Sequence, residues 1–359
     1  MEKKQKSKKI LFVATETKYI KEYCIPILKH LKEEGYEIHI ASFGNEKIEY
    51  CDKQYNISFN TKRIQTYKIL RDVIDENRYD FIQCYTLWGG IITRLAARKS
   101  KSKVIYTANE LCQYKNLSIK KRLLYYPIEK YLSKYTDILI TTTEEDYLLA
   151  KNKFKCKKIK LIEGMCINNY ELETELTDEE REKILKEYNL NKKDYILLNI
   201  GDFTKNNNQI LQIEAIMQII PEYKNIKLLM VGQGPLEEVY SNLIMKYELS
   251  KYIQIIEDEK NITNLLQQCD ILLTTSKNER IDLNVIKAMI LNKPIIASRM
   301  KCYENLLDID YLINLTNSKE LVSKIEKNII LGKRNVYYDI EKYKLENVIQ
   351  SMEKIYKQL

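Results

Sequence analysis

The sequence has few residues that interrupt regular structure, with nine glycines and five prolines among 359 residues. Disordered and fibrous chains are rich in such residues and poor in apolar ones, whereas 45% of this chain is hydrophobic. The composition therefore excludes those classes and favours a globular protein. A single hydrophobic core stops growing at roughly 250–300 residues, so the length predicts two domains.

Histidine is almost absent, since the chain has only His30 and His39. Two histidines offer few ligands for a zinc site and few candidates for a histidine-based catalytic triad. The eight cysteines form no CxxC pair and lie in strand-like and helix-like segments, which is typical of reduced core thiols. We expect no metal site.

Long apolar runs are also missing, because none approaches the roughly 18–20 residues of a membrane-spanning helix. The first nine residues form a lysine-rich arm without the apolar core of a signal peptide. We therefore expect a cytoplasmic protein, and any membrane association would be peripheral, at the inner face of the plasma membrane.

The formal net charge of +9 is concentrated in the first half of the chain. Residues 1–170 carry 33 lysines and arginines against 20 acidic residues, whereas residues 171–359 carry 26 against 30. This asymmetry indicates either an anionic partner for the first half or a solvated lysine-rich surface. No nucleic-acid reader motif accompanies the charge, so we expect no nucleic acid as partner.

The segment Lys115–Lys134 interleaves basic residues with leucine and tyrosine. Such a pattern suits an anionic membrane surface, and Lys120, Lys121 and Arg122 are the candidate contacts. The alternative is an ordinary solvated helix whose leucines and tyrosines belong to the core. The sequence leaves both interpretations open.

Short apolar strands alternate with helical patterns in residues 1–170, which predicts a parallel sheet covered on both faces. The expected strands are Ile10–Ala14, Tyr36–Ala41, Phe81–Tyr85, Val104–Ala108 and Ile138–Thr142. The expected helices are Ile20–Glu34, Gly89–Arg98 and Ile119–Lys134.

A second series follows a lapse in periodicity around residues 164–174, after which Thr177 and Glu180 form a capping-box pattern. The expected strands are Tyr195–Ile200, Lys227–Val231, Ile253–Ile256, Ile271–Thr275 and Pro294–Ala297, and the expected helices are Asp178–Tyr188, Gln209–Ile220, Pro235–Tyr247, Asn284–Leu291, Ser318–Leu331 and Ile340–Gln358. The prediction is α/β, two tandem Rossmann-like doubly wound domains facing a central cleft, over residues 1–170 and 171–340. Residues 341–359 form a last helix that could cross back to the first domain.

Two strand-to-helix turns in the second half are candidate phosphate sites. Gly201 ends a strand, and Lys205 precedes the next helix, whose free amide groups favour an anion. Gly232 and Gly234 allow close backbone approach. For the first turn a purely structural role is an equal alternative, because neither a dinucleotide fingerprint nor a P-loop is present. For the second turn a structural explanation alone would suffice.

Three further features have a structural and a functional interpretation. Trp88 follows a strand and could stack on an acceptor sugar or fill the core. Asp282 could hold sugar hydroxyls or cap the next helix. Asp308 and Asp310 have the DxD spacing of metal-dependent transferases, which we interpret as structural.

These pieces, in this order, resemble the family-four retaining glycosyltransferases of the GT-B type, particularly bacterial exopolysaccharide and capsule enzymes. The resemblance covers nearly the whole chain. In the first half it rests on Lys9–Ala14, Tyr79–Thr86, Gly89–Gly90, Arg94–Arg98, Val104–Ala108 and Leu124–Glu129. In the second half it rests on Val231–Glu237, Cys269–Leu273 and Glu279–Ala297.

The resemblance implies transfer of a hexose-like sugar from a nucleotide-diphosphate sugar, held by the second domain, to a lipid-linked or other glycan acceptor, held by the first. It implies retained anomeric configuration and no metal or other cofactor. Glu279 matches the first acid of the family's paired-glutamate motif, and Gly201 matches the glycine of its diphosphate loop.

Four positions depart from the family pattern. Lys287 stands where the family has its second, ribose-binding glutamate, and Asn207 replaces the lysine that contacts the diphosphate. Asn109 replaces the histidine near the transferred sugar, and Arg280 replaces a glycine. A lysine ammonium cannot accept a hydroxyl proton, so ribose binding must differ or be lost.

Two accounts of these departures remain open. In the first, Lys205, Arg280 and Lys287 supply the cations and the chain is an active transferase. In the second, the chain is a catalytically degenerate relative that binds an acceptor, a membrane or a partner glycosyltransferase.

Overall fold

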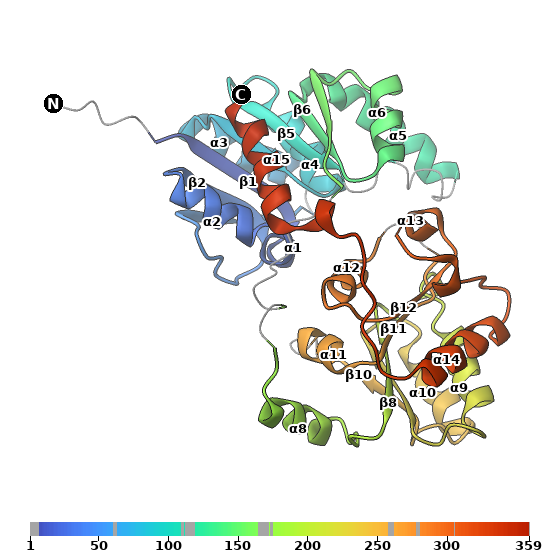
Figure 1. Cartoon of the computed structure of the whole chain (residues 1–359). Helices are drawn as coiled ribbons and strands as arrows, with labels where there is room; N and C mark the ends of the chain where they lie inside the picture. Colours follow the sequence, from blue (N-terminus) through green and yellow to red (C-terminus); the bar gives the residue numbers. More distant parts are fainter. Residues whose placement is uncertain are drawn as a thin grey trace. The chain divides into compact units, whose positions relative to one another are not determined.

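The computed structural model describes residues 7–59, 63–108, 111, 119–163, 172, 175–257, 262–277, 281–304 and 306–358, with the backbone alone for 119–124. The chain divides into two compact units (Figure 1). Unit 1 comprises residues 1–169 and 341–359, and unit 2 comprises residues 170–340. Each unit has a parallel sheet with alternating helices, so the predicted tandem α/β, Rossmann-like fold is confirmed.

The sheet of unit 1 has the strand order β3-β2-β1-β4-β5-β6-β7, with every pair parallel. Its strands are β1 (Lys9–Glu16), β2 (Glu37–Phe43), β3 (Lys53–Asn56), β4 (Phe81–Cys84), β5 (Lys103–Ala108), β6 (Ile138–Thr141) and β7 (Lys158–Leu161). Its helices are α1 (Thr17–Tyr23), α2 (Ile25–Glu33), α3 (Arg63–Asn77), α4 (Leu87–Ala97), α5 (Ile119–Leu132), α6 (Glu144–Lys153) and α15 (Leu345–Lys357). The strand order reverses between β1 and β4.

The central strand β1 is buried on both faces. Ile10, Phe12 and Ala14 belong to one core of unit 1, whereas Leu11 and Val13 belong to another. Successive side chains of a strand point to opposite faces, so the two cores lie on opposite sides of the sheet. Because both faces of β1 are buried, its sequence is a continuous apolar run and does not alternate between apolar and polar residues.

The last helix, α15, packs on the sheet of unit 1 (Figure 1). Its buried residues are Leu345, Val348, Met352, Ile355 and Tyr356. They recur at helical spacing, and the core that they join also contains residues of β1 and α2. The hydroxyl of Tyr356 donates a hydrogen bond to Gln83 at the centre of β4.

The sheet of unit 2 has the order β10-β9-β8-β11-β12-β13. Its strands are β8 (Tyr195–Ile200), β9 (Ile226–Val231), β10 (Ile253–Ile256), β11 (Ile271–Thr274), β12 (Ile295–Ser298) and β13 (Leu312–Ile313). Its helices are α8 (Asp178–Glu187), α9 (Ile210–Ile219), α10 (Glu237–Lys246), α11 (Ile262–Gln268), α12 (Leu283–Ile290), α13 (Lys301–Glu304) and α14 (Lys319–Leu331). The order reverses between β8 and β11.

The structure corrects the prediction at several elements. The predicted helix Ile20–Glu34 is two helices, α1 and α2, which meet at Cys24. Pro26 lies in the first turn of α2, where its missing N–H costs nothing. The sequence pattern did not predict β3, α3, α6, β7 or α11. The strand β3 (Lys-Gln-Tyr-Asn) has no alternation of apolar residues that would predict it. Hydrogen bonding to β2 stabilises it as a strand.

An aspartate immediately before a strand fixes four strand pairs at their amino ends. Its backbone N–H donates to the carbonyl of one residue in the neighbouring strand, and its carboxylate accepts the N–H of that same residue. The pairs are Asp52 with Ile38, Asp80 with Lys9, Asp137 with Val104 and Asp270 with Ile196. This closed pair of bonds sets the register of β3 on β2, β4 on β1, β6 on β5 and β11 on β8.

Candidate functional site

The strand reversal in unit 2 lies next to the loop that carries three of the predicted donor-site residues. In open α/β sheets, ligands bind beyond the carboxyl ends of the strands where the order reverses. The loop after β8, residues 201–209, and the loop after β11, residues 275–282, flank that point. Gly201, Lys205 and Asn207 lie in the first loop, whereas Glu279 and Arg280 lie outside the described residues of the second.

The loops after β8 and β9 nest closely because of their glycines. The N–H of Gly201 donates to the carbonyl of Val231 over 2.9 Å. A Cβ on Gly232 would lie 2.3 Å from the carbonyl oxygen of Gly201, and a Cβ on Gly234 would lie 2.7 Å from that of Phe203. Both glycines have positive φ, +150° and +155°. Gly232 and Gly234 therefore allow the two loops to approach each other closely, which is the structural role predicted for them.

Asn207 joins the loops after β8 and β11. Its Nδ2 donates to the carbonyl of Asp202 over 2.8 Å, and its Oδ1 accepts from the Ser276 hydroxyl over 3.2 Å. The Thr275 hydroxyl lies 2.8 Å from the Asn207 carbonyl oxygen and accepts from Gln212 over 2.9 Å. Thr275 and Ser276 were not predicted as site residues, although their place at the carboxyl end of a predicted strand was a usable signal.

The loop after β8 keeps several donors free. Within the described part of the chain, the amides of Asp202, Lys205 and Asn206 have no hydrogen-bond partner, and the exposed Lys205 side chain makes no ion pair. Free backbone amides beside a cation form an anion-binding arrangement. The N–H of Gly201 itself is already used, so Gly201 contributes shape and its neighbours contribute the donors.

The helix α12 carries Lys287 in its last turn. The Asp282 side chain accepts from the N–H of Asn284 over 2.8 Å and so caps the helix, which was one of its two interpretations. Lys287 is half-buried, and its ammonium has no hydrogen-bond or ion-pair partner among the described residues. An unpaired, half-buried cation on this helix is available to an anion.

The strand reversal in unit 1 lies between β1 and β4, where α4 begins. Trp88 stands in the first turn of α4 and is half-buried. The guanidinium carbon of Arg63 lies 3.4 Å from the Trp88 ring centroid, and Tyr125 meets the ring edge-on at 6.1 Å. Trp88 therefore supports an exposed arginine, a pairing that the sequence did not suggest.

Thr86, which precedes α4, has a strained backbone. Its φ of 60° and ψ of 159° fall in a region that is essentially restricted to glycine. Its hydroxyl bonds to the carbonyl of Tyr85 over 2.6 Å, and α4 has no side-chain cap. Such strain clusters at functional sites. Asn109 and the side chains of Lys120, Lys121 and Arg122 lie outside the described residues.

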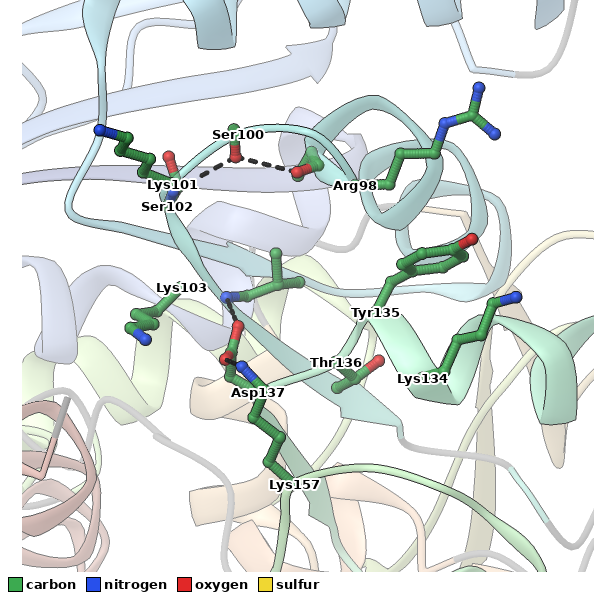
Figure 2. Close-up of a pocket in the computed structure, with 12 residues that line it drawn as sticks. Arg98, Ser100, Lys101, Ser102, Lys103, Lys134, Tyr135, Thr136, Asp137 and Lys157 are labelled. Carbon is green, nitrogen blue, oxygen red and sulfur yellow. Dashed lines mark hydrogen bonds and ion pairs between the residues drawn. The ribbon is translucent and has the colours of Figure 1, made fainter.

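A polar hollow lies at the opposite, amino-terminal end of β5 and β6 (Figure 2). Its volume is ≈ 250 Å³. On its floor, the Asp137 carboxylate accepts from the Val104 N–H over 2.8 Å and from the Lys157 ammonium over 2.7 Å. The sequence analysis did not single out this place.

The described residues contain no group of three or more metal-ligating side chains. Asp308 caps a short 3-10 turn by accepting from the N–H of Asp310, and Asp310 pairs with Lys327 over 2.6 Å. Both carboxylates of the DxD spacing therefore have structural partners. Over the same described ranges, no helix has the length and apolarity to cross a membrane.

Sequence comparison identifies the class of protein. The profile of glycosyl transferases group 1 matches residues 180–345, and that of glycosyl transferase 4-like proteins matches residues 9–143. EpsD, a Bacillus subtilis (strain 168) protein assigned to the glycosyltransferases, is 31% identical over 333 residues, covering 89% of this chain and 87% of EpsD. This chain belongs to the glycosyltransferases, of the family-four, GT-B type.

Solved structures agree on the fold. A glycosyltransferase from Rickettsia africae superposes with a TM-score of 0.75 at 20% identity, covering 98% of both chains. Anabaena HepE, solved in complex with UDP, superposes with a TM-score of 0.78 at 14% identity, covering 98% of this chain and 100% of HepE. The predicted resemblance is confirmed.

Proposed function

We propose that this glycosyltransferase moves a sugar from a nucleotide-diphosphate sugar to a lipid-linked glycan acceptor, with retention, in the synthesis of a cell-surface polysaccharide. The observation that carries the donor part is the loop after β8. There, the free amides of Asp202, Lys205 and Asn206 stand beside the Lys205 ammonium, at the strand reversal of unit 2. HepE, which shares the fold, binds UDP and UDP-glucose.

In this proposal the loop after β8 stabilises the departing diphosphate. Negative charge grows on the leaving group as the bond to the sugar breaks, and fixed amide dipoles and cations are most effective against charge that develops in place. The bridge from Asn207 to Ser276 holds the loop still, so little reorganisation is needed during the reaction. In this proposal Lys205, Arg280 and Lys287 supply the cations and Glu279 orients the donor sugar.

The acceptor part rests on the Arg63–Trp88 pair at the strand reversal of unit 1. A guanidinium lying on an indole keeps its N–H edge free and loses little freedom on binding. Such an edge can bind a phosphate of a lipid-linked acceptor through two parallel hydrogen bonds. The basic residues Lys120, Lys121 and Arg122 of α5 complete the proposed acceptor and membrane face, next to an anionic membrane at the inner face of the plasma membrane. Asn109 is proposed as a catalytic residue with Glu279, near the transferred sugar.

The polysaccharide context comes from relatives. EpsD is one, and another is a Klebsiella pneumoniae protein from the cps region, which is 23% identical over 308 residues, covering 81% of this chain and 82% of that protein. The second candidate function is a catalytically degenerate partner subunit. It is favoured by Lys287, whose ammonium cannot accept a ribose hydroxyl proton.

A transfer assay separates the two candidates. Purified protein is incubated with radiolabelled UDP-, GDP- and ADP-sugars and a bacterial lipid extract, and label entering the organic phase is counted. The proposal expects transfer that Glu279→Ala abolishes and that Glu238→Ala, an exposed residue of α10, leaves unchanged. No transfer from any of these donors by the unmodified protein favours the degenerate subunit.

A further inference from the structure

Two adjoining hollows lie at the amino ends of the strands of unit 1, away from the strand ends that bear the proposed acceptor site. The first is the ≈ 250 Å³ hollow between the loop before β5 and the segment before β6 (Figure 2). The second, of ≈ 650 Å³, lies between the same loop and the amino ends of β1 and β4. Residues 100–103 line both.

The first hollow has an excess of positive charge. Five cations line it against one carboxylate. The cations are Arg98, Lys101, Lys103, Lys134 and Lys157. The carboxylate belongs to Asp137 and already accepts two hydrogen bonds, from Val104 and Lys157. Within the described residues, Arg98, Lys101 and Lys103 have no carboxylate partner. Like charges held together destabilise the folded chain, so an anion here would relieve repulsion.

A serine hydroxyl in this hollow also has no partner among the described residues. Ser102 is 9% exposed and lines both hollows. Its backbone N–H donates to the Ser100 hydroxyl over 3.3 Å, whereas its own hydroxyl has no hydrogen-bond partner in the described part of the chain. The Ser102 Oγ is not among the buried side-chain atoms that lack a partner, so solvent reaches it. The hydroxyl is therefore free to donate to an oxygen of a bound anion.

The walls fit a small hydrophilic molecule. The only apolar residues lining the first hollow are Ala97 and Val104, and both are buried. On one side Lys134 lies over the Tyr131 ring, 3.7 Å from its centroid, and the hydroxyls of Tyr131 and Tyr135 are 3.3 Å apart. Figure 2 shows Arg98, Tyr135 and Lys134 on this side and Lys101 and Lys103 on the other.

We propose that this hollow is a second anion site, which binds a soluble small molecule carrying a diphosphate or two phosphates. Lysine and arginine would contact the phosphate oxygens, and the Ser102 hydroxyl would donate to one of them. The cavity has room for about eight waters at their liquid volume of roughly 30 Å³ each, which suits a diphosphate. The site is independent of the donor loops, which belong to unit 2.

Calorimetric titration with inorganic pyrophosphate tests this proposal, without UDP, because UDP carries a diphosphate and would compete for the hollow. Any binding at the donor loop of unit 2 is common to all variants compared, since their substitutions lie in unit 1. The unmodified protein is expected to bind pyrophosphate. The double variant Lys101→Gln/Lys134→Gln should weaken binding at least about tenfold, because two of the five cations that line the hollow are removed. Ser102→Ala, which keeps the charge, should weaken it about three- to fivefold. The matched control Lys47→Gln/Lys68→Gln changes two exposed lysines of unit 1 elsewhere and should change binding less than twofold.

Thermal unfolding gives a second readout that needs no ligand. Because the proposal invokes repulsion among the cations, Lys101→Gln/Lys134→Gln should raise Tm slightly without anion and abolish the rise that pyrophosphate gives the unmodified protein. Equal effects in the pocket and control variants overturn the proposal. So does binding to phosphatidic acid vesicles without binding to pyrophosphate, since that result assigns the charge to a membrane.

Discussion

The Arg94 guanidinium and the Glu129 carboxylate form an ion pair 2.8 Å long between α4 and α5, with side chains 1% and 0% exposed. Arg94 also donates to the carbonyl of Gly90 over 2.9 Å, and its guanidinium lies 4.0 Å from the Tyr106 ring centroid. Burial alone would lower the pKa of Arg94, but the adjacent Glu129 carboxylate outweighs it and the pKa is raised. The same two helices meet again where Tyr125 touches Trp88.

Removing one member of this pair should be far more damaging than removing both. Glu129→Ala leaves a buried unpaired guanidinium and should lower the free energy of unfolding by roughly 3–5 kcal/mol, whereas Arg94→Met/Glu129→Leu should recover most of that loss. Urea denaturation measures both. Glu163→Ala is the control, because its pair with Lys342 is half-exposed and should contribute less than about 1 kcal/mol. Equal losses for Glu129→Ala and the double variant would contradict this account.

The nesting of the donor loops predicts a difference between two glycines. Gly232 and Gly35 both have positive φ, but a Cβ on Gly232 meets the Gly201 carbonyl at 2.3 Å, and one on Gly35 meets nothing within 4 Å. Gly35→Ala should cost roughly 1 kcal/mol from backbone conformation alone. Gly232→Ala must also push the loop after β8 aside, so it should cost several times more and abolish nucleotide binding. Urea denaturation and UDP titration would show whether the two variants instead behave alike.

Part of the donor-loop arrangement is predictable from the sequence, and part of it is not. Gly201, Gly232 and Lys205 stand out because glycine and lysine directly after an apolar strand are typical of a turn that approaches a phosphate. The bridge from Asn207 to Ser276 and the pair of Arg94 with Glu129 join positions 69 and 35 residues apart. No periodicity links such positions, and only strand order brings them together. The strand β3 was missed because its stability comes from its neighbour.

Stability should fall in mildly acidic solution because of His39. The imidazole is buried and lies 2.7 Å from the Tyr79 hydroxyl and 3.1 Å from the Glu37 carboxylate. Burial lowers the pKa of His39, and Glu37 only partly offsets it. A lowered histidine pKa gives stability that is present above the unfolded value, near 6.5, and is lost as pH falls.

The unfolding free energy should therefore decrease between pH 7 and pH 5, and His39→Gln should flatten that decrease. The measurement is urea denaturation at pH 7.5, 6.0 and 5.0. An equally steep decrease in His39→Gln would assign the effect to other groups.

The Arg63–Trp88 pair should affect the acceptor and not the donor. With an acceptor found in the transfer assay, Arg63→Gln and Trp88→Leu should each raise the acceptor KM about tenfold and leave UDP affinity unchanged, since both residues belong to unit 1. Arg63→Lys should recover only part of the loss, because an ammonium keeps the charge and loses the planar fork. Arg78→Gln, an exposed arginine of the same unit, is the control, and matching effects from it would refute a specific role.

The central claim is that unit 2 holds a working nucleotide site despite Lys287. Calorimetric titration of the purified protein with UDP, GDP and ADP, run beside Lys287→Glu, tests it most directly. The account predicts micromolar binding of one nucleotide by the unmodified protein, and weaker binding by Lys287→Glu because a cation near the phosphates is replaced by a carboxylate. No binding by the unmodified protein, together with binding gained in Lys287→Glu, would contradict the account and show that the donor site was lost at this residue.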